Sequence, residues 1–167
     1  MLKFTIFYLF NMLFMFLLFF YQTSVDFQLI YTNFVNSVLV STLNGFGIYA
    51  IHSGINILLQ TSILVVKFGC NGLEAVLIFT AALLSYGAEW RLKLVWLLKG
   101  IAILMIVNFF RLLLLAYILE NYREHFNFMH DYVTQDIMIF IAIMLFFLFT
   151  QQSLKNVRSR NELLKTD

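Results

Sequence analysis

The sequence has one cysteine, no proline and few charged residues. A lone cysteine cannot form an intramolecular disulfide, which excludes a membrane oxidoreductase that works through cysteine pairs. Charged residues make up only 12% of the chain and hydrophobic residues 62%, including 20 phenylalanines, which is far from the balance of a soluble domain. A chain of 167 residues cannot bury so much apolar surface in water. The composition therefore predicts an integral membrane protein.

Other classes of site are also missing from the sequence. The formal net charge of +2 is too small to indicate a nucleic-acid partner. Histidine and cysteine do not recur at the spacing of a metal site, and no glycine-rich phosphate-binding loop is present. We therefore expect neither a metal nor a cofactor.

The apolar residues form runs that predict an all-α membrane protein with about four transmembrane helices. Residues 4–21 are almost wholly apolar and long enough to cross a hydrocarbon core of about 30 Å. No small-residue cleavage site follows them, so we expect a retained helix and not a signal peptide. The other predicted spans are residues 73–86 (extended if the helix begins near Phe68), residues 94–119 and residues 133–150. Charged or polar connections lie at 89–93 and 120–129, and the whole chain is read as one membrane domain, 1–167.

Between the first two spans lies a more polar insertion, residues 22–67. Residues 26–44 mix apolar and polar side chains, which favours an amphipathic helix on the membrane face, with a further membrane span as the alternative. Residues 45–67 contain glycines and two short β-favouring pieces, 48–51 and 63–66. These features predict a small extended hairpin that leads into Cys70.

Basic residues near the ends of the spans predict the orientation, since cytoplasmic loops are enriched in lysine and arginine. With four spans, one side collects most of them: Lys3, Arg91, Lys93, Lys155, Arg158, Arg160 and Lys165. Only Lys67 and Arg123 fall on the other side, and Lys99 is close enough to its helix end to reach back to the basic surface. Both termini and the 151–167 tail are then cytoplasmic. Cys70 and His130 face outward.

Three residue types that suit nucleophilic catalysis are predicted to share one layer of the membrane. Cys70 lies between two glycines at a helix start, where the helix dipole favours the thiolate. Arg111 lies about 25 Å along its helix from Leu94, in the outer part of the bilayer. His130 immediately precedes the last span, where an imidazole can transfer protons. Cys70, Arg111 and His130 are therefore the candidate catalytic residues.

Each candidate also has a purely structural interpretation. Cys70 can be a small buried hydrophobic residue. Arg111 is costly within an apolar run, and it can serve in an ion pair with Glu74 or as the cation that stabilises an oxyanion. Asn108 lies three residues before Arg111 on the same helical face and can orient its guanidinium. Glu74, one helical turn after Cys70, is interpreted as supportive. The other two histidines, His52 and His125, are expected to be solvated.

These stretches together resemble the exosortase/archaeosortase family of membrane transpeptidases. Residues 70–75 read Cys-Asn-Gly-Leu-Glu-Ala and are similar to the family's cysteine motif. Residues 108–111 read Asn-Phe-Phe-Arg and resemble its Asn-x-x-Arg motif. His130, followed by Tyr132, Val133 and Gln135, resembles its histidine region. The resemblance covers about residues 45–150. The Glu-Ala pair after the motif looks closest to exosortase H, although the chain is short and its last helix lacks tryptophan.

The resemblance implies a cysteine transpeptidase of the inner (plasma) membrane that acts on its extracytoplasmic side. Its substrates would be exported proteins that end in a short motif, a transmembrane helix and a basic cluster. The enzyme would cleave this signal and transfer the protein to an acceptor. The alternative is a non-enzymatic membrane scaffold or transporter subunit with a structural arginine–glutamate pair.

Overall fold

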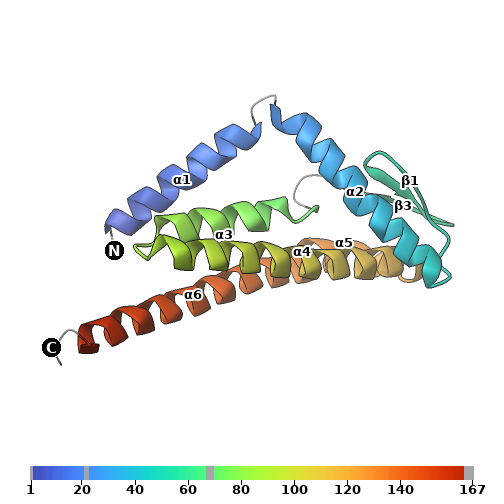
Figure 1. The fold of residues 1–167 in the computed structure, drawn as a ribbon. Helices are drawn as coiled ribbons and strands as arrows, with labels where there is room; N and C mark the ends of the chain where they lie inside the picture. Colours follow the sequence, from blue (N-terminus) through green and yellow to red (C-terminus); the bar gives the residue numbers. More distant parts are fainter. Residues whose placement is uncertain (1, 21–22, 67–69, 164–167) are drawn as a thin grey trace.

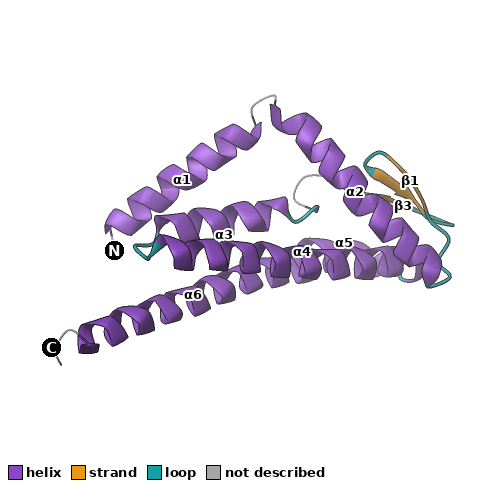
Figure 2. Ribbon diagram, in the orientation of Figure 1, coloured by secondary structure: helices purple, strands orange, loops and turns teal. Residues whose placement is uncertain are grey.

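The computed structural model describes residues 2–20, 23–66 and 70–163, and most of them are helical (Figure 1). The elements in chain order are α1 (Leu2–Phe20), α2 (Thr23–Gly45), β1 (Ile51–Ser53), β2 (Asn56–Leu58), β3 (Ile63–Val65), α3 (Leu73–Ser85), α4 (Trp90–Asn121), the 3₁₀ turn η1 (Arg123–His125), α5 (Phe126–Phe128), the π-helical turn η2 (Met129–Thr134) and α6 (Gln135–Leu163). Figure 2 shows long helical rods with a small patch of strands at one end. The predicted helical fold is confirmed.

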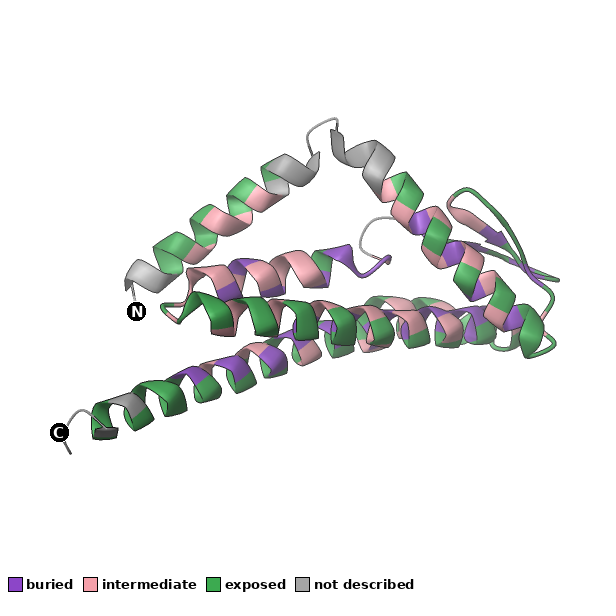
Figure 3. Ribbon diagram, in the orientation of Figure 1, coloured by how far each residue is buried: buried purple, intermediate pink, exposed green. Residues whose placement is uncertain are grey.

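Two helical segments of the described chain are long and apolar enough to cross a membrane: Trp90–Asn121 and Arg123–Ser159. Shorter apolar helices cover Thr5–Met15 and Leu73–Ser85, so a set of four spans stays a prediction. Large apolar side chains such as Phe10 are exposed along the outer helix faces (Figure 3). So much exposed apolar surface is typical of a protein in contact with lipid.

Three helix boundaries differ from the predicted ones. Helix α3 begins at Leu73 and not near Phe68, so Cys70 precedes the helix instead of occupying its first turn; residues 67–69 lie outside the described part. Helix α4 already begins at Trp90, which shortens the predicted hinge. Helix α6 continues through most of the predicted polar tail. No proline occurs in the chain, and a helix without one can extend past the end of its apolar run.

The predicted hairpin is a three-stranded antiparallel sheet with the strand order β1-β2-β3. Ile51 pairs with Leu58, and Asn56 pairs with Val65. Gly54 makes the turn between β1 and β2 with a φ of +60°, a conformation that glycine adopts without steric cost. The sequence pattern missed β2, whose pairing with a strand on each side is set by the folded chain.

Hydrogen bonds from two helices hold the sheet in place. The buried Asn36 of α2 donates through Nδ2 to the carbonyl oxygen of Gly54 at 3.0 Å. At the end of α4, the Glu120 carboxylate accepts from the Thr61 backbone N–H at 3.1 Å and from the Ser62 hydroxyl at 3.0 Å. A first apolar core joins α2, the sheet and the end of α4: Leu39, Leu43, Ala50, Ile57, Leu59, Leu64, Val66, Leu112, Ala116 and Leu119.

A second apolar core joins α3, α4 and α6: Ala75, Phe79, Leu83, Leu104, Met138, Ala142, Leu145 and Phe149. The close approach of α3 to α4 depends on Gly100. A Cβ at this position would lie 2.1 Å from the Phe79 ring, so only glycine leaves space for that ring against α4. Cys70, Arg111 and His130 lie where the two cores meet along α4.

Candidate active site

The turn before α3 is fixed by the buried side chain and the backbone of Asn71. Asn71 Oδ1 accepts from the Leu73 backbone N–H at 3.2 Å, and its Nδ2 donates to the Thr32 hydroxyl of α2 at 3.4 Å. The Tyr31 hydroxyl donates to the Asn71 carbonyl oxygen at 3.2 Å. Helix α2 therefore holds the segment that carries Cys70, which explains why an asparagine follows the cysteine.

Gly72 allows this turn to pack against α4. Its φ is +82°, in the left-handed region, and a Cβ there would lie 2.7 Å from Cγ of Asn108. A side chain would thus be strained in the backbone and would also displace Asn108. Gly72 at the start of α3 and the Asn108 side chain of α4 therefore form one close contact between the two helices.

The structure brings Cys70 and His130 together. The partly buried Cys70 Sγ lies 2.9 Å from His130 Nε2, although the two residues are 60 positions apart in sequence. At this distance the thiol proton can pass to the imidazole, which leaves a thiolate beside an imidazolium. The sequence predicted that the two residues share a layer, and the structure places them in direct contact.

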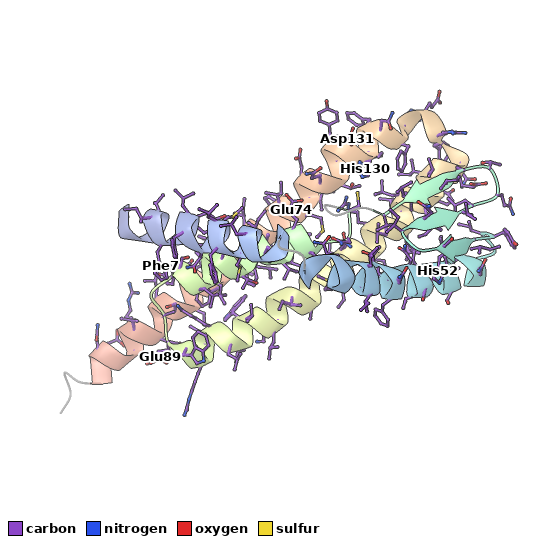
Figure 4. The ribbon with its side chains drawn as sticks, turned by 90° about the horizontal axis from the view of Figure 1, so that it is seen from above. Phe7, His52, Glu74, Glu89, His130 and Asp131 are labelled. Atoms are coloured by element: carbon purple, nitrogen blue, oxygen red, sulfur yellow. The ribbon has the colours of Figure 1, made fainter. Side chains whose placement is uncertain are left out.

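A backbone turn and two side-chain contacts hold the His130 imidazole against the sulfur. His130 lies in the π-helical turn η2, a geometry that is rare in proteins and frequent at functional sites. Its Nδ1 lies 2.7 Å from Oδ1 of Asp131, and its ring stacks on Phe126 at 5.6 Å between centroids. Figure 4 shows His130 and Asp131 side by side, with Glu74 nearer the middle of the molecule, Glu89 toward the opposite end and His52 on strand β1.

Arg111 is 7% exposed and is held at two points. Its Nε donates to the Thr134 hydroxyl at 3.2 Å, and its Nη1 donates to Asn108 Oδ1 at 3.3 Å. Thr134 in turn donates to the His130 carbonyl oxygen at 3.2 Å. Arg111 also interacts electrostatically with Cys70 and Glu74. The cation is thus linked to both members of the cysteine–histidine pair.

Glu74 is exposed and does not form the ion pair with Arg111 that the scaffold interpretation requires. In the part of the chain that the structure describes, no ion pair within 4.0 Å joins Arg111 to Glu74, whereas His125 pairs with Glu124 and His130 pairs with Asp131. Glu74 and Arg111 instead line a small recess of about 40 Å³ beside Gly72. The guanidinium therefore borders a free space next to the turn that carries Cys70.

The recess continues into an apolar groove between α3 and α6. Ala75, Ile78 and Ile139 line both the recess and the groove. Tyr8 of α1 and Phe146 of α6 line the groove further from the site. A site whose entrance is apolar and lies between membrane helices can receive a ligand directly from the bilayer.

Sequence reasoning missed Asn71, Asp131 and Thr134 as parts of this site. Asp131 offered a signal, since it directly follows the candidate histidine, whereas a threonine near the start of an apolar helix gave none. His52 and His125 are exposed, as predicted. In the part of the chain that the structure describes, no group of three or more His, Cys, Asp and Glu residues is arranged to hold a metal ion.

The fold and the site define a transmembrane protein in which a thiol, an imidazole and a guanidinium converge between helices. A family model described as transmembrane exosortase matches residues 1–149. The chain therefore belongs to the transmembrane exosortase family, as the resemblance of its three motifs predicted. No match was found among curated proteins or among solved structures.

Proposed function

We propose that this protein is a membrane-embedded cysteine transpeptidase that uses Cys70 as its nucleophile. The observation that carries the proposal is the 2.9 Å contact between Cys70 Sγ and His130 Nε2, next to the buried guanidinium of Arg111. Nucleophilic catalysis by cysteine needs a base within hydrogen-bond reach and a group that stabilises the oxyanion. Family membership supports a transpeptidase role in general.

In the proposed mechanism the Cys70 thiol gives its proton to His130, and the thiolate attacks the scissile carbonyl carbon. The carbonyl electron pair moves onto oxygen, where the Arg111 guanidinium stabilises the negative charge. Asn108 and Thr134 hold the plane of that guanidinium. When the intermediate collapses, the amine leaves with the proton from His130, and a thioester to Cys70 remains.

The second half of the reaction breaks the thioester and regenerates the Cys70 thiol. An acceptor amine or water gives a proton to His130 and attacks the thioester carbonyl. The C–S bond breaks, and the Cys70 thiolate regains a proton from His130. Transfer to an amine makes the protein a transpeptidase, and attack by water makes it a protease with the same residues.

The proposed substrates are exported proteins whose C-terminal signal contains a short motif, a transmembrane helix and a basic cluster. The apolar groove beside the recess supports a substrate that approaches within the bilayer. The location that fits is the inner (plasma) membrane, with the site on the extracytoplasmic side and both termini in the cytoplasm. The match to exosortase H remains a prediction about subtype.

The test is the Cys70→Ala variant, expressed beside a host protein that ends in an apolar segment followed by basic residues. We expect the wild type to shorten this protein on an immunoblot, and the variant at equal membrane abundance to leave it at full length. Unchanged processing by Cys70→Ala would reject the proposal and favour a scaffold role, for which Cys70→Ser would also be silent.

A further inference from the structure

Asp131 contacts the catalytic histidine of the proposed mechanism but received no role from the sequence. Its Oδ1 lies 2.7 Å from His130 Nδ1, on the side of the ring opposite to the nitrogen that meets Cys70. We propose that Asp131 is a positioning residue that turns the Cys70–His130 pair into a three-membered relay. This inference rests on the proposed function of Cys70 and His130.

The first step of the argument concerns the tautomer of His130. A carboxylate is an acceptor only, so the contact requires that the proton of a neutral imidazole is on Nδ1. Nε2 is then left with a free lone pair that points to the Cys70 thiol. Without Asp131, a neutral His130 is free to carry its proton on Nε2, where it cannot accept the thiol proton.

The second step concerns the charge that forms when the proton moves. After the proton moves from Sγ to Nε2, both ring nitrogens of His130 carry protons. The Nδ1–H of the imidazolium donates a hydrogen bond to the Asp131 carboxylate, and the proton stays on nitrogen. A carboxylate in that place stabilises the imidazolium and therefore the thiolate beside it. No other atom changes its bonding, and Asp131 stays ionised throughout.

The third step concerns the other charges that face the pair. Arg111 from α4 interacts with Cys70 and favours the thiolate, and Glu74 from α3 lines the same recess as that guanidinium. The side chain of Asp131 is 61% exposed and that of His130 is 27% exposed. Solvent reduces the effect of an exposed carboxylate, so Asp131 acts mainly by fixing the ring, and its charge adds a smaller contribution.

The backbone around Asp131 supports the same role. Asp131 and His130 lie in the π-helical turn η2, and Thr134 binds the His130 carbonyl oxygen from the end of that turn. The ring is therefore held by Asp131 at Nδ1 and by Phe126 on one face, while the backbone is held by Thr134. Of Asp131, Phe126 and Thr134, Asp131 is the charged residue that contacts the ring.

The experiment uses the sole thiol of the protein as its reporter, because iodoacetamide alkylates thiolates and Cys70 is the only cysteine. Alkylation of the full chain in detergent is followed by intact mass from pH 6 to pH 10. We expect Asp131→Asn to slow alkylation at pH 7 by about three- to tenfold. At pH 10 the rates should converge, because the thiolate then forms without help from His130.

Three further variants make the result decisive. Asp136→Asn removes an exposed carboxylate one residue beyond the start of α6 and should leave the profile unchanged. Asp131→Glu should restore part of the rate at pH 7. In a His130→Asn background, Asp131→Asn should have no additional effect, because Asp131 acts through the imidazole.

An unchanged rate for Asp131→Asn at pH 7, or an equal slowing in the His130→Asn background, would overturn the role of Asp131. The alkylation measurement needs no substrate. It can therefore contradict the role of Asp131 while Cys70→Ala still abolishes processing. Conversely, Asp131 can tune the thiol as expected even if the Cys70→Ala test rejects the proposed reaction.

Discussion

At the scale of single residues, the site depends on close contacts that leave no room for an additional atom. Gly72 is the clearest example. Its φ lies in the left-handed region, and a Cβ at this position would overlap Asn108. Asn108 accepts from the Arg111 guanidinium, so a change at Gly72 is transmitted to the cation beside Cys70. The backbone conformation and the contact with Asn108 therefore explain why position 72 of the cysteine motif is a glycine.

We predict that Gly72→Ala destabilises the protein by about 2–4 kcal/mol and lowers substrate processing, since it combines left-handed strain with a displaced Asn108. Gly47→Ala is the matched control, because Gly47 has a φ of +80° but no heavy atom lies within 4 Å of the place that a Cβ would take. Thermal unfolding in detergent measures the difference. Equal losses in the two variants would show that the contact with Asn108 is unimportant.

At the scale of elements, Cys70 lies just before α3 and Arg111 lies on α4, so these two helices must keep their spacing. Gly100 allows this spacing because the Phe79 ring occupies the place that its side chain would take. Phe79 is 1% exposed and belongs to the core that joins α3, α4 and α6. A shift of α3 along this contact would move Cys70 relative to Arg111.

We predict that Gly100→Ala destabilises the fold by about 1–3 kcal/mol through overpacking against Phe79. Phe79→Leu alone also destabilises, but the double variant should lose less than the sum of the two, because the smaller side chain makes room for the new methyl group. Unfolding temperatures of the three variants give the coupling. Strict additivity would contradict a contact between these two residues.

The helices and the three candidate residues could be predicted because their signals are local. Apolar runs indicated α1, α3, α4 and α6, and the Cys-Asn-Gly and Asn-x-x-Arg motifs singled out Cys70 and Arg111. The start of α3 and strand β2 were missed, because the left-handed Gly72 and the pairing of β2 between β1 and β3 depend on tertiary packing. The same holds for Thr134, whose link to Arg111 exists only after α4 and α6 pack together.

At the scale of the whole molecule, the two ends differ in character. The first residues of α1, the turn between α3 and α4 and the end of α6 lie at one end, and the sheet lies toward the other (Figure 1). Arg91, Lys93, Lys155 and Arg158 belong to the first end, which fits the cytoplasmic side of a membrane protein. The cysteine–histidine pair lies toward the sheet.

We predict that a membrane-impermeant maleimide added to intact cells labels Cys70, because the proposed orientation exposes the site outward. As the matched control, Lys155→Cys in a Cys70→Ala background places a single exposed thiol on α6 at the basic end, which should react only after the membrane is opened. Mass shifts of the purified chain report both reactions. The reverse pattern would invert the proposed topology.

Helix α4 is one unbroken rod of 32 residues, about 48 Å in length, whereas a hydrocarbon core measures about 30 Å. The rise from Trp90 to Arg111 is about 30 Å, and it sets the height of the guanidinium beside Cys70 above the basic end. Under the proposed function, a substrate anchored at the inner surface by its own basic residues would be cut at this height. Helix α4 then fixes the distance between the inner surface and the thiol. The length of a substrate's apolar segment decides whether its scissile bond reaches Cys70.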